Sequence, residues 1–121
     1  MANQHAKGFQ RLRNATCFSI AGFKATWQHE EAFRQEVLLL IVACPAALYL
    51  AKTPIETLLL IGSVVLVLLV ELLNSAVEAA IDRIGFEHHE LSGRAKDIGS
   101  AAVMLSLIWA AITWTVILFF S

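Results

Sequence analysis

The sequence predicts an all-α integral membrane protein in which an N-terminal amphipathic surface helix precedes three transmembrane helices. Hydrophobic residues make up 58% of the chain and the mean hydropathy is +0.68, whereas soluble proteins contain roughly 45–50% apolar residues. Long uncharged runs alternate with short charged segments, and the lysines and arginines gather in alternate segments. With 121 residues in total, we expect a single membrane-embedded domain over 1–121.

The first element, at about 6–34, is predicted to be the amphipathic surface helix. Its apolar stripe recurs every three or four residues and covers about 80° of a helical wheel: Phe9, Leu12, Thr16, Ile20, Phe23 and Trp27. Lysines and arginines beside this stripe suit lipid headgroups, and Trp27 suits the interface. We expect this helix to lie on the inner membrane surface, because little soluble chain exists for an ordinary soluble helix to pack against.

The three spans are predicted at 35–52, 55–84 and 95–120. Residues 98–120 are 23 consecutive uncharged positions, enough to cross a hydrocarbon core of roughly 30 Å at about 1.5 Å per residue. The first span contains Pro45, which neighbouring helices can accommodate in a membrane. From about Thr57 to Ile81, only Glu71 and Glu78 interrupt the middle span. A cleaved signal peptide is the competing interpretation of the N-terminal region, but the lipoprotein-like IVAC at 41–44 lies beyond the usual cleavage range of about 15–30 residues.

The distribution of cations predicts the orientation in the membrane. Eight of the nine lysines and arginines lie before the first span, or at or between the facing ends of the second and third, and only Lys52 lies at the turn between the first and second spans. Because short loops rich in lysine and arginine stay in the cytoplasm, we expect a cytoplasmic N-terminus and an external C-terminus. The near-balanced total charge gives no indication of a nucleic-acid partner.

Residues 85–97, GFEHHELSGRAKD, form the long polar stretch between the second and third spans. His88 and His89 stand beside Glu87 and Glu90, but a zinc site requires about four ligands at defined spacing. Composition alone therefore favours a solvated linker over a metal site. Cys17 and Cys44 fall in different environments and form no CxxC motif, so we expect neither a disulfide nor a cysteine metal site.

The acidic residues of the middle span form a stripe along one helical face. With Glu71 at 0°, Asn74 lies near about −60°, Glu78 near about −20° and Asp82 near about +20°, over roughly 16 Å of rise. Polar groups can simply hold membrane helices together, at about 1 kcal/mol each, and this explanation suffices for Asn74. A charged group within a span costs at least about 2.5–3.5 kcal/mol, so the two glutamates indicate function.

The chemistry of these groups favours catalysis at the cytoplasmic surface. Burial in lipid disfavours the charged form of a carboxyl group, which makes the deeper Glu71 a candidate proton acceptor. Glu78 and Asp82 could hold Mg²⁺, which often binds through one or two carboxylates together with substrate phosphates. Nearby cations could meet such phosphates: Arg83, Arg94 and Lys96. The chain has no GxxxxGK[ST] loop, so any nucleotide would bind differently from that of a P-loop enzyme.

Three sequence blocks carry a family resemblance. ELLNSAVEAAIDRIG at 71–85, ELSGRAKDIGSAAV at 90–103 and EEAFRQE at 30–36 resemble the prokaryotic diacylglycerol kinase family, small integral membrane enzymes unrelated to soluble kinases. The resemblance implies Mg²⁺- and ATP-dependent phosphorylation of the free hydroxyl of diacylglycerol, which gives phosphatidic acid. It also implies a multi-pass protein of the bacterial inner membrane that recycles diacylglycerol.

The same resemblance implies roles for individual residues. Glu71 would be the general base with Asn74 as a further catalytic residue, and Glu30 and Glu78 would bind the metal. The implied ATP-binding residues are Arg11, Phe18, Glu30, Glu78, Glu87, His89, Lys96 and Asp97. The implied substrate-binding residues are Arg11, Ala15, Trp27, Arg34, Gln35, Glu36, Glu71 and Ser100. Phe18 stands where close relatives carry a tyrosine.

The family assembles as a homotrimer with active sites between subunits, and this chain is expected to do the same. Small residues at 99–102, GSAA, would allow helices to approach closely.

Other functions remain open at the level of sequence. A kinase of the same fold acting on a polyprenol such as undecaprenol would keep the mechanism and change the substrate. A small proton-coupled transporter would also place an acid within the membrane, but it gives no reason for the SGRAKD block. A purely structural membrane subunit would need no paired acids.

Overall fold

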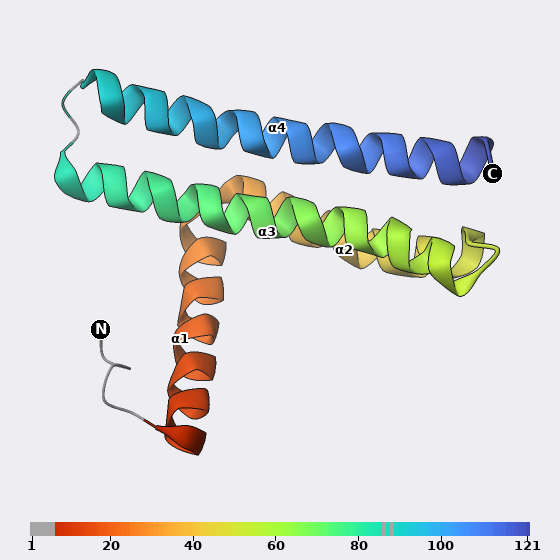
Figure 1. Cartoon of the computed structure of the whole chain (residues 1–121), viewed down its shortest axis with the longest axis horizontal. Coiled ribbons are helices and arrows are strands. Elements are labelled where there is room, and N and C mark those ends of the chain that lie inside the picture. Colours follow the sequence, from red (N-terminus) through yellow and green to blue (C-terminus); the bar gives the residue numbers. More distant parts are fainter. Residues whose placement is uncertain (1–6, 86, 88) are drawn as a thin grey trace. The chain divides into compact units, whose positions relative to one another are not determined.

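The computed structural model describes residues 7–85, 87 and 89–121, and among these it contains four helices and no strand. The chain divides into two compact units, Met1–Glu31 and Ala32–Ser121. The first contains helix α1 (Gly8–His29). Helices α2 (Glu31–Leu50), α3 (Pro54–Ile84) and α4 (Glu90–Phe119) follow in the chain (Figure 1). The predicted all-α class is confirmed.

Helix α1 lies where the apolar stripe predicts the N-terminal helix. No residue of the helix is buried, and Phe9 is 82% exposed. The helix ends one residue before Glu30, whose backbone is extended (φ −120°, ψ 107°) and whose N–H donates to the carbonyl of Thr26 over 2.9 Å. The predicted range 6–34 therefore runs past the end of the helix. Neither glycine nor proline marks this break, so the sequence offers no signal for it.

Helices α3 and α4 run antiparallel and side by side (Figure 1). Helix α3 begins with Pro54 at its first position, after Thr53, whose hydroxyl accepts a 3.2 Å hydrogen bond from the N–H of Glu56; both features favour a helix start. Helix α4 begins at Glu90, because the His89 ring nitrogen Nδ1 accepts a 3.1 Å hydrogen bond from the N–H of Leu91. The predicted start at 95 is thus five residues late.

The late prediction has a physical cause. The charged residues predict where the hydrocarbon core ends, whereas the helix continues through the polar residues 90–97 to its cap at His89. Most of the predicted polar linker is therefore helical. Phe86 and His88 of this stretch lie outside the described part of the chain.

Helix α2 packs onto the other two spans through a small residue. Ala47 is fully buried in a cluster with Leu60 of α3 and Ile117 of α4, and an alanine at this position lets helices approach closely. The indole N–H of Trp114 donates to the carbonyl of Leu60 over 3.1 Å, which ties α4 to α3. Pro45 lies within α2, as the prediction of a continuous span requires.

Most of the surface of the three long helices is apolar and exposed. Each helix is long and apolar enough to cross a membrane, and only 11% of the most apolar window of α4 is buried. Soluble monomers rarely expose contiguous apolar patches above a few hundred Å². Lipid is the solvent in which such a surface is stable, because every helical backbone group is already hydrogen-bonded within the helix. The three predicted membrane spans are confirmed.

Candidate active site

Helix α3 carries the predicted acidic stripe without interruption. Because α3 is continuous from Pro54 to Ile84, residues spaced three and four apart share a face. The stripe grades from buried to open: Glu71 is 5% exposed, and the side chain of Asp82 is 39% exposed. The buried glutamate thus lies deeper along the helix than the groups that solvent can reach.

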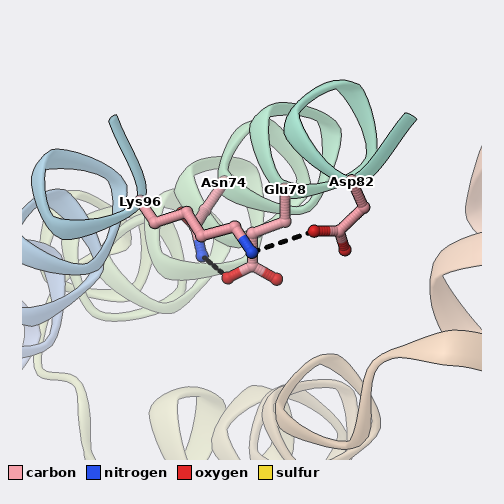
Figure 2. Close-up of polar contacts among 4 residues, drawn as sticks. All are labelled: Asn74, Glu78, Asp82 and Lys96. Carbon is pink, nitrogen blue, oxygen red and sulfur yellow. Dashed lines mark hydrogen bonds and ion pairs between the residues drawn. The ribbon is translucent and has the colours of Figure 1, made fainter. Parts of the chain in front are cut away.

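Two polar contacts organise the open part of the stripe, as Figure 2 shows. The amide Nδ2 of Asn74 donates to Oε1 of Glu78 over 3.2 Å, one turn further along α3. From α4, the Nζ ammonium of Lys96 donates to Oδ1 of Asp82 over 2.9 Å, and it also attracts the carboxylate of Glu78. A cation and two carboxylates therefore gather where α3 and α4 meet.

Beneath this cluster lie buried oxygens that make no hydrogen bond to the residues described here. They are Oε1 of Glu36, Oδ1 of Asn74 and Oγ of Ser75. Glu36, on α2, is 8% exposed and lies near the carboxyl group of Glu71. Burying polar groups without partners is costly, so this concentration indicates a functional site rather than a packing contact.

A small pocket opens beside the cluster at the connection between α3 and α4. It has a volume of about 150 Å³ and is lined by Ile81, Gly85, Glu87, His89, Ser92, Gly93 and Lys96. Ligand pockets usually measure roughly 300–1,000 Å³, so this one would enclose only part of a nucleotide. Three of the predicted ATP-binding residues, Glu87, His89 and Lys96, are nevertheless brought together around one space.

The remaining predicted site residues of the second unit do not line this pocket. Arg34 and Gln35 precede Glu36 on α2, while Asp97 and Ser100 are exposed on α4. Residues of the first unit lie on α1 or directly after it: Arg11, Ala15, Phe18, Trp27 and Glu30. Glu30 and Glu78 belong to different units, so their pairing as metal ligands stays a prediction. Within residues 7–85, 87 and 89–121, no group of three or more His, Cys, Asp or Glu side chains could hold a metal ion.

The structure adds one contact and two residues to the predicted site. Asp82 is predicted on the stripe as a possible Mg²⁺ ligand, but its ion pair with Lys96 depends on how α4 faces α3. Ser75 lies one turn after Glu71, a spacing that could have suggested a shared face. Gly99 was noted as a small residue, but its contact with Asn74 has no sequence signal.

Comparison with known proteins identifies the family. Residues 17–118 match the model of the prokaryotic diacylglycerol kinase family. The chain belongs to this family. It is 52% identical over 118 residues to a diacylglycerol kinase of Escherichia coli K12, covering 98% of this chain and 96% of the relative. It is 50% identical over 113 residues to a diacylglycerol kinase of Haemophilus influenzae, covering 93% and 96% respectively.

A diacylglycerol kinase of Pseudomonas aeruginosa is similar over 111 residues at 49% identity, covering 92% of this chain and 90% of the relative. The resemblance expected from the three sequence blocks is therefore confirmed. The matched region of the family includes α2, α3 and α4 nearly complete, and with them the cluster around Glu78.

Proposed function

We propose that this chain transfers the γ-phosphoryl group of ATP to the free hydroxyl of sn-1,2-diacylglycerol, giving phosphatidic acid. The observation that carries this proposal is the polar stripe of α3, in which the buried Glu71 lies on the same helix as Asn74 and Glu78, with Lys96 of α4 beside that stripe. Membership of the prokaryotic diacylglycerol kinase family, with relatives that carry this name, supports the choice of substrate.

The stripe would serve two substrates of opposite character. Glu71 lies about 10 Å deeper along the helix than Glu78, at about 1.5 Å of rise per residue. A lipid hydroxyl would approach Glu71 from the membrane, and the nucleotide would approach Lys96 and the pocket at Glu87 and His89 from the cytoplasm. This grading from buried to open matches an acceptor that is a lipid and a donor that is soluble.

The residues present fit a Mg²⁺ ion. Glu78 supplies a hard carboxylate oxygen at the open part of the stripe, and Mg²⁺ needs only one or two protein carboxylates beside phosphate oxygens; Glu30 is the second ligand that we propose. Bound Mg²⁺ would neutralise charge on the transferring phosphoryl group. The amide of Asn74 would hold the carboxylate of Glu78 in orientation through their 3.2 Å hydrogen bond, since partners of metal ligands fix the geometry of those ligands.

The proposed reaction is a direct displacement. The hydroxyl oxygen of diacylglycerol forms a bond to the γ-phosphorus as the bond from that phosphorus to the bridging oxygen of ATP breaks, and ADP leaves. Glu71 takes the hydroxyl proton as general base. Lys96 stabilises negative charge near the phosphates while Asp82 holds its ammonium in place over 2.9 Å. Phosphoryl transfer asks little more of a protein than positioning and charge stabilisation.

We further propose a homotrimer in the bacterial inner membrane, with a cytoplasmic N-terminus and active sites between subunits. The low burial of α4, 11% over its most apolar window, leaves surface for neighbouring copies as well as for lipid. The distribution of cations supports the orientation. A protein that cross-links only as a monomer while fully active would contradict the trimer.

The test is phosphate transfer from labelled ATP to diacylglycerol, in mixed micelles with Mg²⁺, for the wild-type protein and the Glu71→Gln variant. We expect transfer by the wild type and a loss of roughly 100- to 10,000-fold in the variant, the usual contribution of a general base. Glu56→Gln is the matched control, because Glu56 lies on the same helix but in its first turn, where it accepts a hydrogen bond from the N–H of Lys52 over 2.8 Å.

A parallel assay with undecaprenol separates the two lipid kinase activities. Preference for undecaprenol would keep the mechanism and change the acceptor. Folded wild-type protein that phosphorylates neither lipid would refute the kinase proposal, and ATP-independent flux of a solute across vesicles would then favour a transporter.

A further inference from the structure

Gly99 of α4 faces the amide of Asn74 across the contact between α3 and α4. A Cβ atom added to Gly99 would lie 2.0 Å from Oδ1 of Asn74 and 3.1 Å from its Cγ. Atoms in ordinary van der Waals contact are 3.4–4 Å apart, so any larger residue would collide with the amide. By contrast, a Cβ atom added to Gly62 or Gly93 would meet nothing within 4 Å.

The same amide is held from its other side by Glu78. Its Nδ2 donates to Oε1 of Glu78 over 3.2 Å, while its Oδ1 is buried and has no hydrogen-bond partner among the described residues. This oxygen points at the backbone of Gly99, where the Cα hydrogens can make the weak C–H···O contact common at helix–helix interfaces. The glycine surface and the carboxylate therefore confine the amide between them.

We propose that Gly99 is a positioning residue, which fixes the orientation of the Glu78 carboxylate through the amide of Asn74. The inference rests on the proposed function to the extent that Glu78 binds the metal of the kinase reaction. Gly99 itself would touch neither nucleotide nor lipid. Because Gly99 has no side chain, the amide oxygen of Asn74 has room where α4 packs against the acidic stripe of α3.

A larger residue at 99 could be accommodated in two ways, and both disturb the cluster. If the amide of Asn74 rotates away, its hydrogen bond to Glu78 is lost. If α4 instead moves away from α3, the contact of Lys96 with Asp82, now 2.9 Å, becomes longer. Lys96 lies three residues before Gly99 and shares its helical face, so the two contacts would move together.

A double-mutant cycle tests the proposal, with the full-length chain in bicelles. The variants are Gly99→Ala, Asn74→Ala and the combination of both, and Gly62→Ala is the control for replacing a glycine in a transmembrane helix. In the combined variant the added Cβ atom would meet only the Cβ atom of residue 74, at 3.8 Å, which is an ordinary contact. The collision is therefore present in the single Gly99→Ala variant and absent from the combined one.

Two measurements are made on each variant. The first is the melting temperature without ligand, and the second is the affinity for Mn²⁺ by electron paramagnetic resonance, with a non-hydrolysable ATP analogue bound. We expect Gly99→Ala to melt several degrees below wild type, because overpacking destabilises a close contact. We also expect its Mn²⁺ affinity to fall roughly 10- to 100-fold, the usual consequence of losing a partner of a metal ligand.

In the Asn74→Ala background, Gly99→Ala should change neither quantity further, because coupled residues show non-additive effects. Gly62→Ala should match wild type in both. Should Gly99→Ala fail to fold, recovery of folding in the combined variant supports the proposal.

The proposal is overturned by a folded Gly99→Ala protein with wild-type Mn²⁺ affinity. It is also overturned by a loss of equal size in both Asn74 backgrounds, which would mean that Gly99 acts on helix packing alone. A wild-type protein that neither binds Mn²⁺ with the nucleotide nor transfers phosphate would refute the proposed function, and the melting cycle would still decide whether Gly99 and Asn74 are coupled.

Discussion

Near residues 85–89, α3 and α4 meet through Lys96 and Asp82, whereas toward the C-terminus the same two helices meet through Leu60, Trp114 and Ile117. We call the first region the polar end and the second the apolar end of the interface. Leu60 is completely buried, while the side chains of Lys96 and Asp82 are 44% and 39% exposed. The interface between α3 and α4 thus has one buried, apolar part and one exposed, charged part.

The difference separates the part of the interface that stabilises the helix pair from the part that we propose for chemistry. In lipid, apolar burial gives little drive for association, so close packing and single hydrogen bonds hold helices together. The apolar end has both, in the Leu60 cluster and the Trp114 hydrogen bond. At the polar end, buried oxygens of Asn74 and Ser75 make no hydrogen bond to the described residues. Such local violations are expected at functional sites.

Substituting Glu78 at the polar end should give the largest effect. Glu78→Gln keeps the shape of the side chain but removes the charge of the proposed metal ligand, so we expect kinase activity to fall at least about 100-fold while the melting temperature changes little. Activity measured against Mg²⁺ concentration checks this expectation. A variant that regains full activity at moderately higher Mg²⁺ would show that Glu78 is not an essential ligand.

At the apolar end, Leu60→Ala should lower stability and leave activity per folded molecule almost unchanged. Removing a fully buried leucine leaves a cavity, which destabilises by about 2 kcal/mol or more, yet activity per folded molecule should stay close to wild type. Reversible unfolding in mixed micelles measures the loss of stability. Leu58→Ala is the control, because Leu58 is 71% exposed on the same helix. Equal destabilisation by both variants would contradict the asymmetry of burial.

Lys96→Met sharpens the comparison at the polar end. The substitution removes the charge but keeps an apolar stem, and we expect kcat/KM for ATP to fall about 10-fold, which corresponds to about 1.4 kcal/mol. Stability should change by less than about 1 kcal/mol, because both partners of the ion pair are substantially exposed. Lys52→Met is the control at the opposite end of α3. If Lys96→Met lost more stability than Leu60→Ala, the polar end, and not the apolar end, would be the main source of stability.

The smallest predicted effect concerns the hydrogen bond at the apolar end. Trp114→Phe removes the N–H that donates to the carbonyl of Leu60 over 3.1 Å and keeps an aromatic ring. Polar contacts between membrane helices average about 0.6 kcal/mol, so we expect a loss of that size in the free energy of unfolding. Trp109→Phe, on the exposed face of α4, should lose less.

Much of the fold could be predicted because the membrane imposes simple rules. A span needs about 20 apolar residues, so the uncharged run at 98–120 predicts a transmembrane helix without any knowledge of its neighbours. Helical periodicity alone places Glu71, Asn74 and Glu78 on one face. The boundaries were predicted less well. The break at Glu30 has no glycine or proline, and the start of α4 depends on the His89 cap rather than on hydropathy.

The sequence by itself determined which segments cross the membrane, which face of α3 is acidic and, through its characteristic blocks, the family. These properties depend on residues close together in the chain, where helix geometry fixes their relation. Tertiary structure alone decided that Lys96 reaches Asp82, that Glu36 lies near Glu71 and that Gly99 accommodates the amide of Asn74. Each of these contacts requires a particular face of one helix to meet a particular face of another. That rotation is set by side-chain packing along the whole interface, and no local pattern encodes it.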